Sequence, residues 1–226
     1  MRMLFCFISI LFFLISNAQF TNLPNFDEKN LKFGYFIGTN TYNYKIKYEE
    51  DLYPLKVEKG TGLNVGLIGE IKIRKNLNLS FEPGLYSNNT KIIFNEKIGF
   101  NSLNDTVWNV KSNNIHLPIL LKYSSNRLNN FKPYLKAGLS TSINLGKIEG
   151  SFENYSMENF NLKKIGFYYE LAFGIDFYLR YFKFSPSLRG VFSIKNELPE
   201  NIPENPWTGN IDKMFTRAVF INLSFY

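Results

Sequence analysis

The stretch "FYYELAFGIDFYLRYFKFSPSLRGVFSI", residues 167–194, alternates between large apolar residues and polar or small ones. The first half places apolar side chains at every second position: Phe167, Tyr169, Leu171, Phe173, Ile175 and Phe177. The positions between them carry Tyr168, Glu170, Ala172, Gly174, Asp176 and Tyr178. A period of two residues is typical of a β-strand, whose side chains point alternately to opposite faces. A second run begins at Phe182, so the stretch predicts two strands whose apolar face must be covered by a core or by lipid.

The same alternation recurs along the chain, and no convincing 3.6-residue period interrupts it. Eight runs are found, at about 31–41, 61–74, 76–88, 112–124, 131–145, 166–179, 181–195 and 215–226. Long and short connections alternate between these runs. The long ones are at about 42–60, 89–111, 146–165 and 196–214, and the short ones are at 74–76, 124–130 and 179–181. If neighbouring runs pair antiparallel, all long loops lie at one end of the sheet and all short turns at the other.

An even number of strands, short turns at one end and long loops at the other is the plan of an outer-membrane barrel. Closing the sheet pairs every backbone group inside lipid, and the acyl chains then cover the apolar face. The sequence therefore predicts an all-β fold, an eight-stranded antiparallel up-and-down transmembrane β-barrel over residues 31–226. The alternative is a soluble lipocalin-like barrel or sandwich with its apolar face inward. The charges in mid-strand and the apolar-aromatic closing strand "AVFINLSFY" favour the membrane barrel.

The first 20 residues, "MRMLFCFISILFFLISNAQF", have the pattern of a secretory signal. We expect residues 1–18 to be a cleaved signal peptide and residues 19–30 to form a periplasmic N-terminal segment. A transmembrane anchor is the alternative, but the apolar run is short for a span of about 20 residues. The only cysteine, Cys6, lies within the signal, so the mature chain is expected to have no disulfide.

The polar face of the predicted strands carries charged side chains that would point into the barrel. An eight-stranded barrel is just wide enough for its interior side chains, so we expect a structural network of ion pairs and hydrogen bonds rather than a substrate site. Its predicted members are Glu70, Lys72, Glu82, His116, Lys122, Lys136, Glu170, Asp176 and Arg189.

The sequence offers no candidate for catalysis. His116 is the only histidine, and one imidazole without further ligands does not make a metal site. Glu170 and Asp176 would lie roughly 20 Å apart along one strand, too far for an acid–base pair. We therefore expect no enzyme activity, no cofactor, no metal and no small-molecule substrate. The formal charge of +7 is dispersed and no RNA- or DNA-binding motif is present, so nucleic acid is not an expected partner.

The predicted short turns are basic and contain no acidic residue. Their cations are Arg74, Lys75, Arg127, Lys132 and Arg180. Two interpretations remain open: contact with lipid head groups, or a periplasmic rim that docks an acidic protein partner.

Several segments resemble the PorT family, outer-membrane proteins of Bacteroidetes. They are "NLPNFDEKNLKFGYFIG", "LSFEPGL", "IHLPILLKYSSNRLNNFKPYLKAG", "YYELAFGIDFYLRYFKFSPSLRG" and "RAVFINLSFY", colinear over nearly the whole mature chain. The resemblance implies an outer-membrane component of the type IX (Por) secretion system, which exports cargo including proteases, adhesins and gliding-motility proteins. The narrow lumen argues for an accessory or docking barrel rather than the conduit, with other type IX components as partners.

The resemblance also draws attention to the segment before the first strand, whose candidate contact residues are Leu23, Pro24, Phe26 and Asp27. This segment either binds a partner or plugs the barrel mouth. Both termini are expected in the periplasm and the long loops outside the cell. Two other functions remain open: a stand-alone barrel that binds a ligand or surface through its long loops, with Trp108 and Trp207 as exposed contacts, and a narrow channel.

Overall fold

The computed structural model describes residues 21–48, 56–93, 107–145, 163–198 and 211–226. The predicted signal peptide, residues 1–18, lies outside these ranges, as do Trp207 and the middle parts of the long connections. The side chain of Trp108 also lies outside the described part of the chain. Within the described ranges, no helix is long and apolar enough to cross a membrane.

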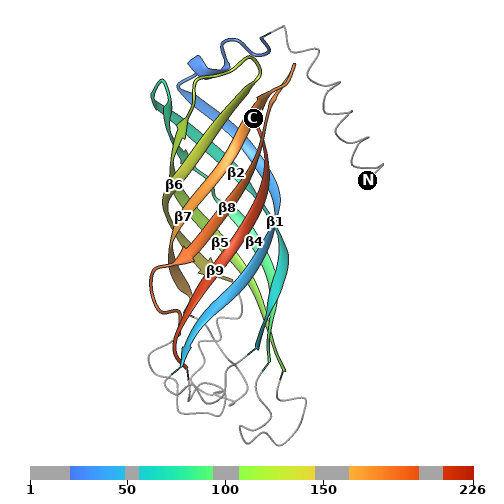
Figure 1. The fold of residues 1–226 in the computed structure, drawn as a ribbon, viewed down its shortest axis with the longest axis vertical. Helices are drawn as coiled ribbons and strands as arrows, with labels where there is room; N and C mark the ends of the chain where they lie inside the picture. Colours follow the sequence, from blue (N-terminus) through green and yellow to red (C-terminus); the bar gives the residue numbers. More distant parts are fainter. Residues whose placement is uncertain (1–20, 49–55, 94–106, 146–162, 199–210) are drawn as a thin grey trace, which may run out of the picture.

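The described chain forms a closed antiparallel barrel (Figure 1). Its strands are β1 Leu31–Tyr48, β2 Lys56–Arg74, β3 Leu77–Phe81, β4 Gly84–Ile93, β5 Val107–Ser124, β6 Phe131–Asn144, β7 Ile165–Tyr178, β8 Lys183–Ser193 and β9 Ile211–Phe225. β3 and β4 do not pair with each other; each pairs with both β2 and β5. All other strands pair with their neighbours in sequence, and β1 pairs with β9 to close the ring. The three short turns, the start of the described chain at residue 21 and the C-terminus lie toward one end of the barrel in Figure 1, and the long connections leave from the other. We name these the short-turn end and the long-loop end.

β3 and β4 occupy one position in the ring, because both lie between β2 and β5. The barrel is therefore eight-stranded, as predicted, although its third strand is interrupted at Glu82 and Pro83. Proline has no N–H to donate to the ladder, which accounts for the break. Hydrogen bonds continue across it, since the Pro83 carbonyl accepts from the Leu67 N–H at 2.9 Å and the Glu82 N–H donates to the Pro118 carbonyl at 3.2 Å.

The strands at the long-loop end extend farther than the sequence predicted. β1 continues to Tyr48 and β2 begins at Lys56, so both strands extend into the connection predicted at 42–60. β1 stays paired with β9 as far as Tyr48. Backbone pairing needs no apolar side chains, so the strands continue where the alternation fades.

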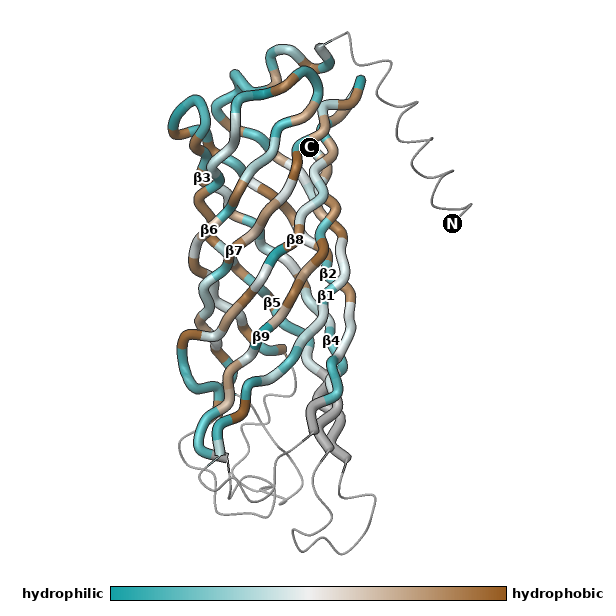
Figure 2. Tube along the Cα trace, viewed as in Figure 1, coloured by the Kyte–Doolittle hydropathy of each residue, from teal (hydrophilic) through white to brown (hydrophobic). Residues whose placement is uncertain are grey.

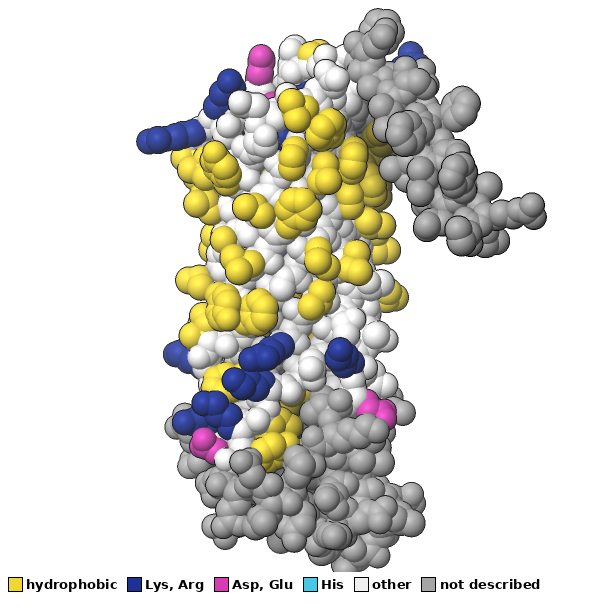
Figure 3. Space-filling view, viewed as in Figure 1, with side chains coloured by type: hydrophobic (Ala, Val, Ile, Leu, Met, Phe, Trp, Pro, Cys, Tyr) yellow, Lys and Arg dark blue, Asp and Glu magenta, His cyan; other side chains and the backbone are white. Residues whose placement is uncertain are grey.

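Hydrophobic and hydrophilic residues alternate along the strands (Figure 2), and hydrophobic side chains cover the outer surface over the middle of the barrel (Figure 3). Leu67 and Leu139 are 66% and 62% exposed, and the alternate residues of the opening stretch are exposed or half-exposed. Such a wall would be unstable in water and fits the acyl chains of a bilayer. The outward orientation inferred from the alternation is thus confirmed.

The interior is filled with side chains. An apolar and aromatic cluster lies inside the barrel, comprising Phe36, Tyr42, Ile68, Tyr86, Val191, Ala218 and Phe220. Most of the other buried side chains are polar, and they include charged residues that are almost fully buried.

Candidate functional site

The first group of buried charges lies in the middle of the lumen around Arg189 of β8. Its guanidinium donates to Glu82, at the break between β3 and β4, and to Glu170 of β7 at 3.4 Å. Glu82 also accepts from Lys136 of β6 at 2.5 Å, and Glu170 lies 2.5 Å from Nε2 of His116 on β5. All five side chains are at most 3% exposed, so strands far apart in the sequence are joined across the lumen.

The second group lies around Lys122 of β5. Its ammonium donates to Asp176 of β7 at 2.8 Å and to Glu70 of β2 at 3.3 Å. Lys183 contacts Asp176 at 3.5 Å, and Lys32 contacts Glu70 at 3.5 Å. We call the two groups together the lumen network. Such networks hold a barrel together only while every charge keeps its partner.

The structure places eight of the nine predicted interior residues in the lumen network. The exception is Lys72, which is only half-buried and donates to the backbone carbonyl of Asp27 at 2.9 Å, near the end of β2. Sequence analysis missed Lys32 and Lys183. Both alternate with outward-facing neighbours, so strand periodicity applied up to the strand ends would have identified them.

The N-terminal segment before β1 packs into the mouth at the short-turn end. The Asn22 N–H donates to Oδ1 of Asn130 at 2.8 Å, and its side-chain amide donates to the carbonyl of Tyr178 at 3.1 Å. The Phe26 ring lies edge-on to the Tyr178 ring, with the ring centres 6.2 Å apart. The segment therefore occupies the barrel mouth, as the plug interpretation expects, and binding of a partner stays a prediction. We name residues 21–30 the N-terminal plug.

Asp27 anchors the N-terminal plug inside the mouth. The Tyr178 hydroxyl lies 2.7 and 2.9 Å from its two carboxylate oxygens, and Lys132 donates to Oδ2 at 3.1 Å. Burial raises the pKa of Asp27, but the Tyr178 hydrogen bond and the charges of Lys132 and Lys32 outweigh it and lower the pKa below its ordinary value. Asp27 is therefore held as a carboxylate.

Arg127 holds the N-terminal plug from the turn between β5 and β6. Its guanidinium lies over the Tyr178 ring, 3.7 Å from the ring centre. It also donates to the backbone carbonyls of Leu23, at 3.1 Å, and Asn22. Arg127 thus binds the chain's own N-terminal segment instead of forming part of an open basic surface.

Only three of the five cations predicted for the basic rim lie exposed at the short turns. Lys132 was placed in a turn, but it lies within β6, is 6% exposed and points inward to Asp27. Its neighbour Phe131 takes the outward position, so the alternation itself turns Lys132 into the lumen. Arg74, Lys75 and Arg180 are exposed as predicted. Together with exposed Pro24, these three cations form what we name the short-turn rim.

We expect Asp27→Asn to release the N-terminal plug while the barrel stays folded. A spin label on Cys in place of Pro24, read by electron paramagnetic resonance, should be immobile in the otherwise unchanged protein and mobile in the Asp27→Asn variant. Because the folded-state pKa of Asp27 is lowered, its stabilising contribution is present above the ordinary aspartate pKa and is lost as the pH falls through the folded value. The label should therefore also become mobile on acidification to below about pH 4.

Glu28→Gln is the matched control, since Glu28 is the adjacent carboxylate and is exposed. It should leave the label immobile at neutral pH. Equal mobility in the Asp27→Asn and Glu28→Gln variants would contradict the role of Asp27 as the anchor.

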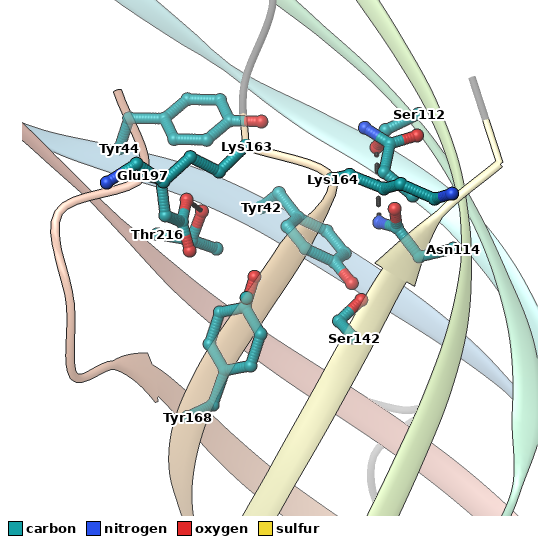
Figure 4. A pocket seen from close by; sticks show the side chains of 12 residues that line it. Tyr42, Tyr44, Ser112, Asn114, Ser142, Lys163, Lys164, Tyr168, Glu197 and Thr216 are labelled. Atoms are coloured by element: carbon teal, nitrogen blue, oxygen red, sulfur yellow. Dashed lines mark hydrogen bonds between the residues drawn. The ribbon is translucent and has the colours of Figure 1, made fainter. Parts of the chain in front are cut away.

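A small polar cavity of about 30 Å³ lies at the opposite, long-loop end of the barrel (Figure 4). Tyrosine, amide, hydroxyl and lysine side chains line it, including Tyr42, Tyr168, Asn114 and Lys164. Glu197 is 5% exposed, and its Oε2 accepts from the Thr216 hydroxyl, while Oε1 has no hydrogen-bond partner among the described residues. Burial raises the pKa of Glu197 above its ordinary value. We name this the long-loop pocket.

The described residues contain no cluster of three or more His, Cys, Asp or Glu side chains that could hold a metal ion. The geometry is that of a closed membrane barrel with a filled lumen, a plug at one mouth and a polar pocket at the other.

The profile of the family described as "Outer membrane protein beta-barrel domain" matches residues 17–198, which is most of the chain. The protein therefore belongs to this family and is an outer-membrane β-barrel protein, embedded in the lipid bilayer by its strands. No curated protein matches the chain by sequence.

Several solved structures of outer-membrane proteins are similar to the chain. OprG from Pseudomonas aeruginosa is 13% identical, with a TM-score of 0.47 over 85% of this chain and 93% of that one. Neisserial surface protein A is 11% identical, with a TM-score of 0.46 over 87% and 98%. The attachment invasion locus protein Ail of Yersinia pestis is 9% identical, with a TM-score of 0.39 over 87% and 98%. Membership of the family rests on the matched profile and on the barrel itself.

Proposed function

We propose that this barrel is an accessory, docking component of the type IX secretion system, needed for export of cargo across the outer membrane. The resemblance to the PorT family is the source of the secretion role. The observation that supports an accessory role is the filled lumen. Arg189, Lys122 and Leu120 are each at most 1% exposed inside it, so protein cargo has no path through this chain.

The short-turn rim is the proposed docking surface, and an acidic surface of another secretion component is its proposed partner. Arg74, Lys75 and Arg180 have no ion-pair partner in the part of the chain that the structure describes. Pro24 and Glu28 are exposed residues of the N-terminal plug, at the same end of the barrel as the three cations. We therefore treat the short-turn rim and the exposed side of the plug as one surface for a partner. We place this face in the periplasm and the long loops outside the cell.

Charge reversal at the rim tests the proposal. In cells whose own copy is deleted, we expect export of sorting-domain cargo to stop and the unchanged protein to restore it. The variant Arg74→Glu/Lys75→Glu/Arg180→Glu should assemble into the membrane but fail to restore export. Crosslinking of intact outer membranes followed by mass spectrometry should show a secretion component captured by the unchanged protein and lost from the variant.

Exposed cations elsewhere provide a matched control. Reversing Lys59, Lys164 and Lys195 changes the net charge by the same amount at the long-loop end. This control should still restore export. If the rim variant restored export as well as the control does, the rim would not be the docking surface. If deletion left export intact, the secretion role itself would be wrong.

The long-loop pocket favours a second candidate function, a stand-alone barrel that binds a small polar ligand. Its carboxylate, lysine, amide and phenol groups converge on one cavity, as in many ligand sites (Figure 4). Deletion of the gene separates the two functions, since a stand-alone binding barrel would leave cargo export unchanged.

A further inference from the structure

A patch of cations lies on the outer wall of the barrel, toward the long-loop end of the seam between β1 and β9. Its members are Lys45, Lys47, Lys213 and Arg217, all exposed. In the strand register, Lys45 lies opposite Phe215, and Lys47 lies opposite Lys213. Figure 3 shows Lys and Arg side chains gathered beyond the edge of the apolar band at this end. We name these four residues the wall patch.

The wall patch carries a positive charge that the described protein neutralises only in part. The acid paired with it is Asp212, 3.7 Å from Lys213, and both side chains are largely exposed. Lys45, Lys47 and Arg217 have no ion-pair partner within the described ranges. Four cations gathered on adjacent strands repel one another, so an anionic ligand would stabilise the arrangement.

The strand register places the wall patch at the level of lipid head groups. On β9 the outward positions run Phe225, Leu223, Ile221 and Val219, and Arg217 is the next one. Arg217 lies opposite Phe192 of β8, whose ring stacks on Tyr169 of β7 with the ring centres 5.1 Å apart. Aromatic rings beside the edge of an apolar band mark the membrane interface in barrels. The cations therefore face the bilayer's polar layer, on the wall rather than on the loops.

From this position and charge we infer that the wall patch binds the phosphate groups of an anionic glycolipid in the leaflet at the long-loop end. Lysine and arginine both bind phosphate oxygens, arginine through paired N–H donors. The neighbouring aromatic and aliphatic side chains would pack against the acyl chains of the same lipid. This inference does not depend on the secretion role.

Native mass spectrometry of the full mature chain, released from zwitterionic detergent micelles, tests the inference with bis-phosphorylated lipid A as the probe. We expect lipid A to bind, and the variant Lys45→Gln/Lys47→Gln/Arg217→Gln to bind it at least about 10-fold more weakly. The matched control Lys29→Gln/Lys59→Gln/Lys195→Gln removes three exposed cations that lie outside the wall patch and the short-turn rim, and it should bind like the unchanged protein. Lipid A stripped of its phosphates should bind more weakly than intact lipid A, to about the same extent as in the wall-patch variant.

Equal binding by both triple variants, or equal binding of phosphorylated and stripped lipid A, would overturn the inference. A sulfated heparin oligosaccharide forms the second arm, and if it bound while lipid A did not, the patch would recognise a soluble polyanion instead. Folding of each variant is checked by its heat-dependent gel mobility. Should the triple variant misfold, the single change Arg217→Gln should still weaken lipid A binding measurably, and no change there would equally overturn the inference.

Discussion

Replacing Arg189 by methionine should lower the free energy of unfolding of the barrel by about 3–5 kcal/mol, the usual cost of removing one partner from a buried ion pair. Arg189 is 1% exposed and is bonded to both Glu82 and Glu170. Without it, Glu82 would keep only Lys136 and Glu170 only His116 as a charged or ionisable partner, in a space closed to water. The measurement is equilibrium unfolding in urea in detergent micelles, followed by heat-dependent gel mobility and circular dichroism.

Arg217→Met is the matched control for this prediction, because Arg217 is exposed on the wall of the same barrel. In micelles without glycolipid it should change the free energy of unfolding by less than about 0.5 kcal/mol. The double variant Arg189→Met/Glu82→Gln should lose less free energy of unfolding than the two single variants lose in sum, because both partners of the ion pair are removed together. An Arg189→Met barrel within about 1 kcal/mol of the unchanged protein would show that the lumen network is not needed for folding.

The sequence was sufficient to predict the barrel because a strand in a bilayer must alternate between apolar outward and polar inward side chains. Inside a bilayer each strand must turn apolar side chains outward, so the alternation from Phe167 to Phe177 predicted both the strand and its orientation. The same rule predicted the buried positions of Glu82, Glu170 and Arg189. Where the strands leave the apolar layer, their outward side chains can be polar, so the alternation ends before the strand does. For this reason β1 and β2 are longer than predicted.

The plugged mouth could not be predicted in the same way. The contacts of Asn22, Leu23 and Asp27 with Arg127, Lys132 and Tyr178 join residues more than 100 positions apart. A local sequence pattern cannot predict such contacts. They form only when the barrel closes and brings the turn after β5 next to the N-terminal segment. Lys132 is different, because its position between outward Phe131 and Pro133 of β6 already favoured an inward side chain.

Placing an arginine in the middle of the outer wall should be costly in a bilayer. Leu67 is 66% exposed near the centre of the outward apolar run of β2, which extends from Leu63 to Ile73. We expect Leu67→Arg to make folding into lipid vesicles less favourable by about 2–4 kcal/mol, because the guanidinium would have to leave water for hydrocarbon. Folding is measured by titration with urea in the presence of vesicles.

Thr41→Arg is the matched control near the rim of the same wall. Tyr35 of β1 pairs with Leu67, and Thr41 lies farther along β1 toward the long-loop end, opposite Val219 of β9 and just before the row of the wall patch. Here an arginine can reach the polar layer, so the cost should be about 0–1 kcal/mol. In detergent micelles, whose apolar layer is thin and adaptable, the difference between the two variants should shrink. Equal costs at Leu67 and Thr41 in vesicles would mean that the exposed apolar wall does not face lipid, and a protein partner would then have to cover it.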